Sequence, residues 1–385
     1  MTGAEVAACT AVLVAAAALT ASRWWDVDPG RPGAPLVVRA QALVPGAGGA
    51  ALVVLAAALP AGAGALAAAA ALLVAVHAAL AAPGWSAGAA PSASPGPEQA
   101  PTGPRVRLLA LNTWYGRADA RAAAALLQRL RPDVVALVEL TPAGLDRLES
   151  AGALEHLPHR AGRAAEGGVG TLLAARWALE EVLADDDLPR RGAVPGVPPA
   201  EPASDNPAAV VRVPGGSGLL VRAAHPYYPA LGDVRPWRHQ LAALERWCRR
   251  STGEATPHLG GQRTAAAAAD AVVVLGDLNA TTDHPALRRL LLPRGPMRLA
   301  SRAAGRGRSP TWPVVAPLPG LRGLVALDHV LVHGAQVLRA GTAPLRGTDH
   351  RAVWADVLLP GGGDDVARDD VARGAGLDDP SGLDR

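Results

Sequence analysis

The sequence places carboxylate, imidazole and amide side chains at the ends of short, strongly apolar runs. Carboxylate and amide oxygens are the donors that hard divalent cations prefer, and imidazole changes its charge near neutral pH. A carboxylate beside a buried strand is unfavourable unless a cation or hydrogen bonds compensate it. These residue types therefore indicate metal-assisted acid–base chemistry. The side chains concerned are Asn112, Glu139, His225, Asp277, Asn279, Asp328, Asp349 and His350.

The apolar runs that carry these side chains are predicted to be β-strands. They are short, rich in Val, Leu and Ala, and bounded by turn residues, which is typical of buried strands. Stretches at 118–130, 235–250 and 284–292 are predicted to be helices. Strands and helices mixed at this density predict an α/β (α+β) fold, a two-sheet sandwich with helices outside. Strand ends that converge from two sheets would bring all these polar side chains to one rim. The predicted strands are RVRLLAL (105–111), DVVALVEL (133–140), GVGTLLAAR, AAVVRV, LLVRAAH, AVVVLGDLN, LDHVLVHG, AQVLRAG and RAVWADV.

The order of these motifs resembles that of endonuclease/exonuclease/phosphatase enzymes of the deoxyribonuclease-like fold. A single motif would be weak, because D-x-N also occurs in Asx turns, but GDLN followed by LDHV and TDH forms a strong set. The resemblance implies a four-layer αββα sandwich with two mixed β-sheets over residues 105–360. It also implies a metal-dependent hydrolase of phosphate esters, of the phosphodiesterase, nuclease or phosphatase type. The motifs are LNTWYG, VVALVEL, the histidine of AAHPYYP, VVVLGDLNATTDHPAL, LDHVLV and GTDH.

The resemblance implies that Glu139 is the principal ligand of a Mg²⁺ ion, with Mn²⁺ as the alternative ion. Asn112 and Asp349 would lie close to the same ion. Mg²⁺ keeps several waters and typically needs only one or two carboxylates from the protein. The residues alone also leave structural roles open. Asn112 could cap the turn that follows it, and Glu139, which precedes Thr141 and Pro142, could start a helix.

The resemblance implies catalytic roles for the other five side chains. Asp277 would position or deprotonate the attacking water, and Asn279 would hold a phosphate oxygen. His350, oriented by Asp328, would act on the scissile phosphate, because a carboxylate partner fixes the tautomer of an imidazole and favours its charged form. His225 matches the family's other histidine, which binds the phosphate or assists the leaving group. A catalytically silent binding or scaffold protein on the same fold is the alternative. It predicts losses among these positions, and none is missing.

The first 82 residues are predicted to be a membrane region with about three transmembrane helices. Apolar runs at 6–22, 36–59 and 62–82 each approach the roughly 20 residues that a helix needs to cross a bilayer. The second run contains Arg39 and is interrupted by Pro45 and three glycines. An Ala-rich helical hairpin outside any membrane is the alternative. We predict a multi-pass membrane protein, in the plasma membrane if the source is bacterial, and leave open which side the C-terminal domain faces.

The rest of the chain divides by composition. Residues 83–104 are expected to be a Pro/Ala/Ser linker, and residues 361–385, which contain DDVAR twice, a disordered acidic tail. The first 104 residues carry three Arg against four acids and the tail carries three Arg against seven Asp, so the +3 of the whole chain leaves +8 for 105–360. A basic domain suits a polyanionic substrate. The predicted partners are a phosphate ester (nucleic acid, phospholipid head group or nucleotide) and the lipid bilayer, with no protein partner.

Overall fold

The computed structural model describes residues 1–85, 103–182, 206–215, 218–253, 269–307, 309–314 and 323–361. Of the linker expected at 83–104, residues 86–102 lie outside these residues, and so does the expected acidic tail from residue 362, whereas residues 83–85 belong to the last helix of the N-terminal region. Residues 183–205 and 254–268 also lie outside the described residues.

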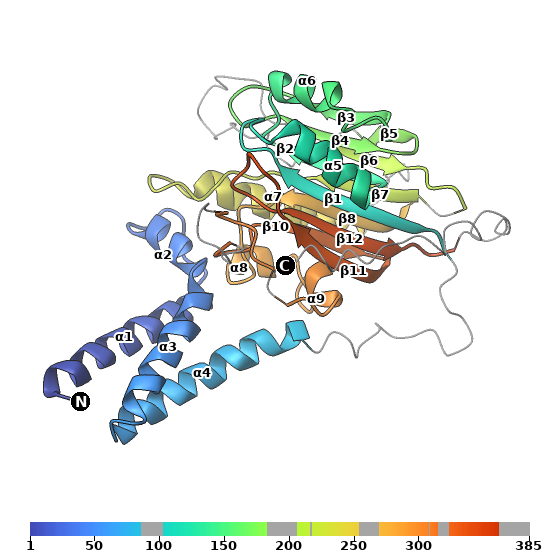
Figure 1. The fold of residues 1–385 in the computed structure, drawn as a ribbon. Coiled ribbons are helices and arrows are strands. Elements are labelled where there is room, and N and C mark those ends of the chain that lie inside the picture. The colour runs from blue at the N-terminus through green and yellow to red at the C-terminus, as the bar shows by residue number, and fades with distance from the viewer. Residues whose placement is uncertain are drawn as a thin grey trace.

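Two six-stranded sheets form the centre of the domain (Figure 1). In spatial order the first sheet contains β11 (Gln336–Ala343), β12 (Ala352–Leu358), β1 (Arg105–Asn112), β2 (Val134–Val138), β4 (Thr171–Ala175) and β3 (His159–Arg163). The second contains β5 (Leu179–Val182), β6 (Ala208–Val211), β7 (Gly218–Ala223), β8 (Ala269–Asp277), β10 (Asp328–His333) and β9 (Arg298–Leu299). Each sheet has one parallel pair, β1 with β2 and β7 with β8, among antiparallel neighbours. Both sheets are therefore mixed, as predicted.

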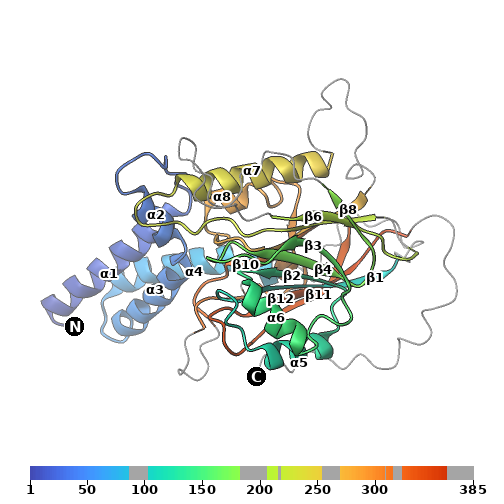
Figure 2. The same cartoon turned by 90° about the horizontal axis from the view of Figure 1, so that it is seen from above.

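Each parallel pair is joined by a helix that crosses outside its sheet, because parallel strands need a long crossover connection. Helix α5 (Ala120–Leu130) joins β1 to β2, and α7 (Arg235–Ser251) joins β7 to β8. The short helices α6 (Pro142–Ser150) and α8 (Pro285–Arg288) follow β2 and β8. Figure 2 shows α7 and the α5–α6 pair on opposite sides of the two sheets.

Alternation along β1 explains how one strand serves two cores. Val106, Leu108 and Ala110 pack between the sheets, whereas Leu109 and Leu111 pack under α5. Successive side chains of a strand point to opposite faces, so a strand buried on both sides reads as a continuous apolar run. In β8, Val272 and Val274 pack on the outer face of the second sheet, under α7 and α8. The result is the predicted four-layer αββα sandwich.

The helix predicted over residues 284–292 is shorter in the structure. Only α8, four residues long, is helical there. The Leu292 amide donates to the Met297 carbonyl at 2.9 Å, and Leu291 forms a bridge with Met297. The backbone thus pairs with the segment before β9 instead of continuing the helix. A further single turn, α9 (Ala300–Ala303), follows β9.

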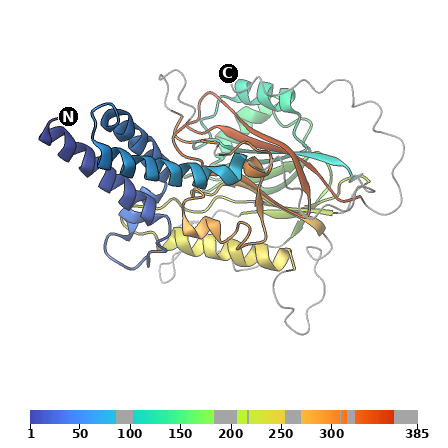
Figure 3. The same ribbon diagram turned by 90° about the horizontal axis from the view of Figure 1, so that it is seen from below.

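The N-terminal region contains α1 (Gly3–Ser22), α2 (Ala34–Gln41), α3 (Val44–Ala58) and α4 (Gly64–Trp85), with α3 in contact with both α1 and α4. In Figures 1 and 3 these blue helices extend together from one side of the domain. Helix α1 and the first 18 residues of α4 are long and apolar enough to cross a membrane. Helices α2 and α3 qualify only as a pair bent by 67°. The described residues thus hold two candidate spans, or three if the bent pair is one.

The run expected at 36–59 is broken because Pro45 lies in the first turn of α3. Proline has no amide hydrogen to donate to a preceding turn, so it starts a new helix rather than extending α2. Exposed apolar side chains lie on the outside of these helices. They include Leu52, Val53, Leu59 and Leu72, which are 56–70% exposed.

Residues 23–38, which we call the docking segment, pack against α7 and against the segment that follows β8. The buried Arg23 forms an ion pair with the buried Asp283. Asp26 pairs with Arg238 on α7 and with Arg289 beside α8, both at 2.5 Å. The chain between the first two helices is thus held to the domain by charged contacts.

Apolar contacts accompany these ion pairs. Val27, Ala34 and Val38 belong to the same buried cluster as Trp237 of α7 and Leu287 of α8. The docking segment therefore completes part of the core on the outer face of the second sheet.

Candidate active site

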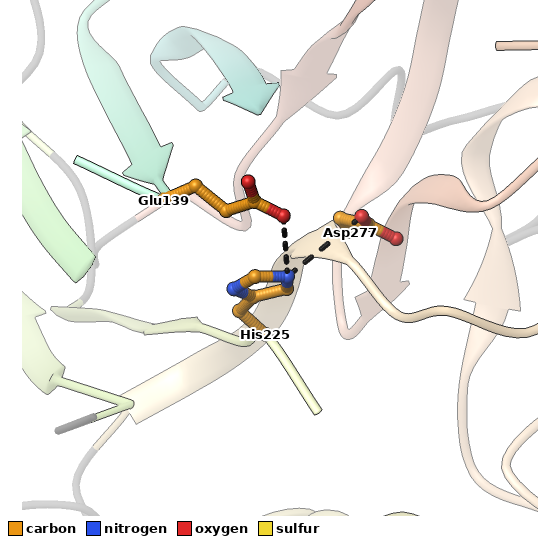
Figure 4. A group of neighbouring side chains, drawn as sticks. All are labelled: Glu139, His225 and Asp277. Atoms are coloured by element: carbon orange, nitrogen blue, oxygen red, sulfur yellow. Dashed lines mark ion pairs between the residues drawn. The ribbon is translucent and has the colours of Figure 1, made fainter. Parts of the chain in front are cut away.

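Four of the eight side chains lie at the carboxyl ends of the two parallel strand pairs. Asn112 is the last residue of β1 and Glu139 follows β2, whereas Asp277 is the last residue of β8 and His225 follows β7. The two sheets face each other, so these ends meet at one edge of the sandwich. Figure 4 shows Glu139, His225 and Asp277 pointing toward one another.

Asn112 connects the carboxylates contributed by the two sheets. Its amide nitrogen donates to Glu139 Oε1 at 3.1 Å and to Asp277 Oδ2 at 3.0 Å. Its amide oxygen accepts from the Trp114 amide at 2.9 Å, which fixes the orientation of the side chain. His225 Nε2 lies 3.6 Å from Glu139 Oε1 and 3.8 Å from Asp277 Oδ2. These four side chains form a single polar cluster.

His350 and Asp328 approach this cluster from the antiparallel neighbours of β1 and β8. Asp328 opens β10 directly opposite Asp277, and His350 lies two residues before β12. His350 Nδ1 and Asp328 Oδ2 are 2.7 Å apart, both side chains being buried. The other ring nitrogen, Nε2, is 3.7 Å from Asp277 Oδ2. Thr348 supports this arrangement by accepting from the His350 amide at 3.1 Å.

Two pKa values in the cluster are raised, for different reasons. Burial raises the pKa of Asp277, and the nearby Asp328 carboxylate raises it further. Burial acts to lower the pKa of His350, but the carboxylates of Asp328, Asp277 and Asp349 outweigh it and raise this pKa to about 10. His350 is therefore an imidazolium at neutral pH in this arrangement. A cationic donor next to a phosphate would stabilise negative charge on it.

Two residues of the candidate site adopt backbone conformations that are rare for residues other than glycine. Glu139 has φ 53° and Asn279 φ 48°, and the neighbouring Trp114 and Tyr115 also have positive φ. Such conformations persist only where surrounding contacts fix them, and they cluster at functional sites. Glu139 does not start the following helix, since the N-cap of α6 is Thr141.

Asn279 is held by contacts on both of its sides. Its backbone amide donates to Asp277 Oδ1 at 2.8 Å, and its side-chain nitrogen donates to the Pro226 carbonyl at 3.0 Å. The Trp237 indole also donates to the Asn279 carbonyl at 3.0 Å. An amide nitrogen carries two hydrogens, so one donor remains for a substrate oxygen.

Gly276, within GDLN, lets β8 approach the chain that carries His225. A Cβ at this position would lie 2.1 Å from the Ala224 carbonyl oxygen, and φ is 147°. Any side chain would force β8 and the residue before His225 apart. The glycine of this motif therefore sets the distance between Asp277 and His225.

Asp349 takes a different place from the other predicted metal ligands. Its Oδ2 accepts from the Trp312 indole at 3.0 Å, and its Oδ1 is 3.9 Å from His350 Nε2. Asp349 thus lies beside His350, while Asn112 and Glu139 lie together on the other side of the cluster. The Trp312 ring is tilted against His350, with centroids 6.5 Å apart.

Two groups among the described residues could hold a metal ion, each with ligand atoms within 4.8 Å of one another. The first is Glu139, His225 and Asp277, and the second is Asp277, Asp328 and His350. In the second group the Asp328–His350 hydrogen bond already occupies one ring nitrogen. The first group offers two carboxylates that face each other through Asn112, a donor set that suits a hard divalent cation.

Sequence reasoning did not identify several residues that hold the site. Thr311 Oγ1 accepts from the Asp328 amide at 3.2 Å, and Asn206 Oδ1 accepts from the His225 amide at 2.7 Å. Trp237 and Trp312 make the contacts described above. These four side chains lie in loops or on a helix distant in sequence from their partners, so no local pattern identifies them.

The sequence model of the Endonuclease/Exonuclease/phosphatase family matches residues 109–255 and 258–350. This is more than half of the chain and includes every one of the eight side chains. The chain therefore belongs to the endonuclease/exonuclease/phosphatase family. No curated protein sequence matches it.

Solved structures with a similar fold share little sequence with this chain. Truncated TDP2 from Caenorhabditis elegans has 15% identity and a TM-score of 0.47, over 66% of this chain and 98% of that one. An endonuclease/exonuclease/phosphatase from Beutenbergia cavernae has 17% identity and a TM-score of 0.45, over 67% and 72%. TDP2 from D. rerio, solved with a single-strand DNA product, has 15% identity and a TM-score of 0.45, over 66% and 98%. The family assignment rests on the sequence match.

Proposed function

We propose that the chain is a membrane-anchored hydrolase of phosphate esters that depends on Mg²⁺, with Mn²⁺ as the alternative ion. One observation carries this proposal. Asp277 lies within 3.8 Å of both imidazoles, and Asn112 links it to Glu139 at the opposite side of the cluster. Such a cluster combines a water-activating carboxylate, a cationic donor and a metal-binding carboxylate within one small volume.

Glu139 and Asn112 would hold the divalent cation, close to His225. The ion, when bound, supplies charge neutralisation on the phosphate and stabilises the leaving oxygen. Asp277 would orient the attacking water and accept its proton. Its carboxylate is tied at Oδ1 by the Asn279 amide, so Oδ2 is the oxygen directed into the cluster.

His350 would bind a phosphate oxygen through Nε2, since Nδ1 is engaged by Asp328 at 2.7 Å. Asn279 would donate its second amide hydrogen to the same phosphate, and His225 would face the leaving group. Positioning and electrostatic stabilisation together account for most of the rate acceleration expected in such a site. The candidate spans α1 and α4 support membrane anchoring by their length and composition.

Purified full-length chain should be assayed with bis(p-nitrophenyl) phosphate and p-nitrophenyl phosphate, with Mg²⁺, with Mn²⁺ and with chelator. We expect at least one of the two esters to be hydrolysed, and we expect this hydrolysis only when a divalent ion is present. Glu139→Gln should lower the rate and raise the Mg²⁺ concentration needed, because it removes a ligand charge at nearly unchanged shape. Asp277→Asn should lower the rate by about 10²- to 10⁴-fold.

Glu155→Gln is the matched control, since Glu155 is exposed and lies outside the cluster. It should leave both rate and metal requirement unchanged. If Glu139→Gln behaved like Glu155→Gln, Glu139 would not be the ligand. If no ester were hydrolysed with any ion, the hydrolase proposal would be wrong.

A further inference from the structure

Large exposed hydrophobic side chains on the domain are concentrated at the edge of the sandwich that carries the candidate active site. We call this edge the catalytic edge. Among its described residues, seven large hydrophobic side chains are exposed, and six of them lie in the loops that surround the site. A scattered apolar residue needs no explanation, but a concentration around one opening marks an interaction surface. We call these six side chains the apolar rim. They are Trp114, Tyr115, Tyr228, Leu231, Trp312 and Leu324.

Each pair in the apolar rim is attached to a catalytic-edge residue. Trp114 and Tyr115 follow Asn112 within three positions, and Tyr228 and Leu231 follow His225 within six. Their exposed fractions range from 36% for Trp114 to 63% for Leu231.

The remaining pair belongs to the loop beside the imidazole. Trp312 donates to Asp349, and the Leu324 amide donates to the Trp312 carbonyl at 2.9 Å. The apolar rim therefore approaches the cluster from three separate loops.

The candidate spans leave the domain at this same edge. The docking segment contacts Asp283, His284 and Arg288, which follow the carboxyl end of β8, and Arg238, near the start of the helix that follows His225. Figure 1 shows α1, α3 and α4 on the side of the domain toward which β1 runs.

The domain-side end of α1 has the composition of a membrane–water boundary. Trp24 and Trp25 follow α1 and are 60% and 53% exposed. Tryptophan is enriched at such boundaries, where its amphipathic ring lies at the level of the head groups. Arg31 and Arg39 are also exposed there. Arginine side chains in this position attract the negative head groups of lipids.

We propose that the catalytic opening faces the bilayer and that the substrate is a membrane lipid whose head group carries the scissile phosphate ester. This inference rests on the proposed hydrolase function and on the anchoring helices. The apolar rim contacts the head-group region of the leaflet on the domain's side. A lipid phosphate then reaches the cluster without leaving the bilayer.

The Trp114–Tyr115 pair shows how the rim combines apolar and cationic character. The Arg117 guanidinium lies 4.9 Å from the Trp114 ring centroid and 6.0 Å from that of Tyr115. This stacking keeps a positive charge next to two amphipathic rings. Such a combination matches a surface of apolar chains and anionic phosphates, and interfacial segments use it to bind lipids.

The reaction on such a lipid is a simple hydrolysis. The oxygen of water forms a bond to phosphorus, and the bond between phosphorus and one ester oxygen breaks. One proton of the water passes to Asp277, and the departing alcohol oxygen takes up one proton. The products are a free alcohol and a phosphate that carries one ester fewer.

The first test compares presentation of one head group. Full-length chain in phosphatidylcholine nanodiscs is given phosphatidylglycerol, phosphatidylinositol or phosphatidate in the disc, and the same head groups on short-chain, water-soluble lipids. We expect at least one long-chain lipid to be hydrolysed faster than its short-chain form by about tenfold or more, since each buried CH₂ adds to interfacial binding. Single-stranded DNA and bis(p-nitrophenyl) phosphate are measured in parallel.

The second test uses a matched pair of Leu→Ser variants. Leu231→Ser removes an apolar-rim side chain, whereas Leu292→Ser removes the one large exposed hydrophobic side chain among the described residues of the domain that lies outside the rim, at 47% exposure. We expect Leu231→Ser, and Tyr228→Ser likewise, to lower lipid hydrolysis about tenfold while the rate on bis(p-nitrophenyl) phosphate stays constant. Leu292→Ser should change neither rate.

The outcomes separate this inference from the hydrolase proposal. Hydrolysis of the soluble diester or of DNA, with no lipid cleaved in the disc, would overturn the lipid substrate and leave the hydrolase intact. Equal effects of Leu231→Ser and Leu292→Ser on lipid hydrolysis would overturn the role of the apolar rim. Absence of hydrolysis of every substrate would overturn the hydrolase proposal itself.

Discussion

His284 joins the docking segment to the domain, and we expect its protonation to destabilise the protein in mildly acidic solution. Its Nδ1 accepts from the Thr281 amide at 2.8 Å, and its Nε2 lies 2.8 Å from the Val38 carbonyl oxygen, to which it donates. One ring nitrogen must accept while the other donates, so only the neutral imidazole fits. Burial accordingly lowers the pKa of His284 from 6.5 to about 4.

The sign and size of the effect follow from this gap. A histidine with a lowered pKa in the folded state contributes stability above pH 6.5, and this contribution is lost as the pH falls toward 4. The whole gap of about 2.5 pH units corresponds to about 3 kcal/mol of unfolding free energy. About 2 kcal/mol of it would be lost by about pH 5.

The assay is a thermal melt of the full-length chain in detergent micelles at pH 8 and at pH 5. His284→Gln keeps a donor and an acceptor on one side chain but does not titrate in this range. It should therefore lose less stability between the two pH values than the wild type. His333→Gln is the matched control, because His333 Nδ1 donates to the Pro296 carbonyl at 2.9 Å but lies at the far end of β10, away from the docking segment.

Other buried histidines do not obscure this comparison. Burial also lowers the pKa of His329, whereas the carboxylates around His350 raise its pKa, so the wild type contains contributions of both signs. They are shared by the variant, and the difference between the two proteins isolates His284. If the wild type and His284→Gln lost equal stability between pH 8 and pH 5, the assignment of a neutral His284 whose protonation destabilises the fold would be refuted.

Three further predictions concern the His350–Asp328 pair, the buried Arg23–Asp283 ion pair and the membrane anchoring of the chain. His350→Ala should lower kcat by about 10²- to 10⁴-fold, and adding Asp328→Ala should cost little more, because the two act as one unit. A folded His350→Ala protein with near-wild-type kcat would remove this residue from the site. Asp283→Asn should lower the stability by about 3–5 kcal/mol, since it takes the carboxylate away from the buried Arg23; an unchanged melting temperature would contradict this. The full-length chain should stay with membranes through high-salt and carbonate washes, and release by salt alone would show peripheral attachment.

The sheets and the site edge could be predicted because their signal is local. Apolar runs of five to nine residues end in a single polar residue, and that polarity switch marks both the strand and its end. The order of the motifs then indicates which strand ends meet. Asp277 and Asp328 are an example, because the sequence places each at one end of a predicted strand and the structure pairs them directly opposite each other in the register.

The docking segment could not be predicted, because its contacts are distant in sequence. Ala34 and Val38 lie on one face of the short helix α2, but Pro29, Gly30, Pro32 and Gly33 separate them from Val27, so no continuous period marks the three as one buried set. The segment therefore looks like a loop between two spans. The backbone contact between Val38 and His284 joins residues 246 positions apart. Only the assembled second sheet and α7 create the apolar surface that the segment covers.

The docking segment also bears on how the chain crosses a bilayer. Its contacts with the domain, through Arg23 and Asp26, require that both lie on the same side of a membrane. Helix α4 ends on that side too, because it contacts α9. If α1 and α4 both cross, the chain must return to the far side between them, and α3 is the part available to do so, because Ala34 and Val38 hold α2 against the domain. Helix α3 alone spans about 22 Å at about 1.5 Å per residue, less than the roughly 30 Å of a bilayer core, so the residues beside it must also lie in the bilayer. The exposed Arg31 and Arg39 then lie on the domain's side and count toward the orientation of the catalytic domain itself.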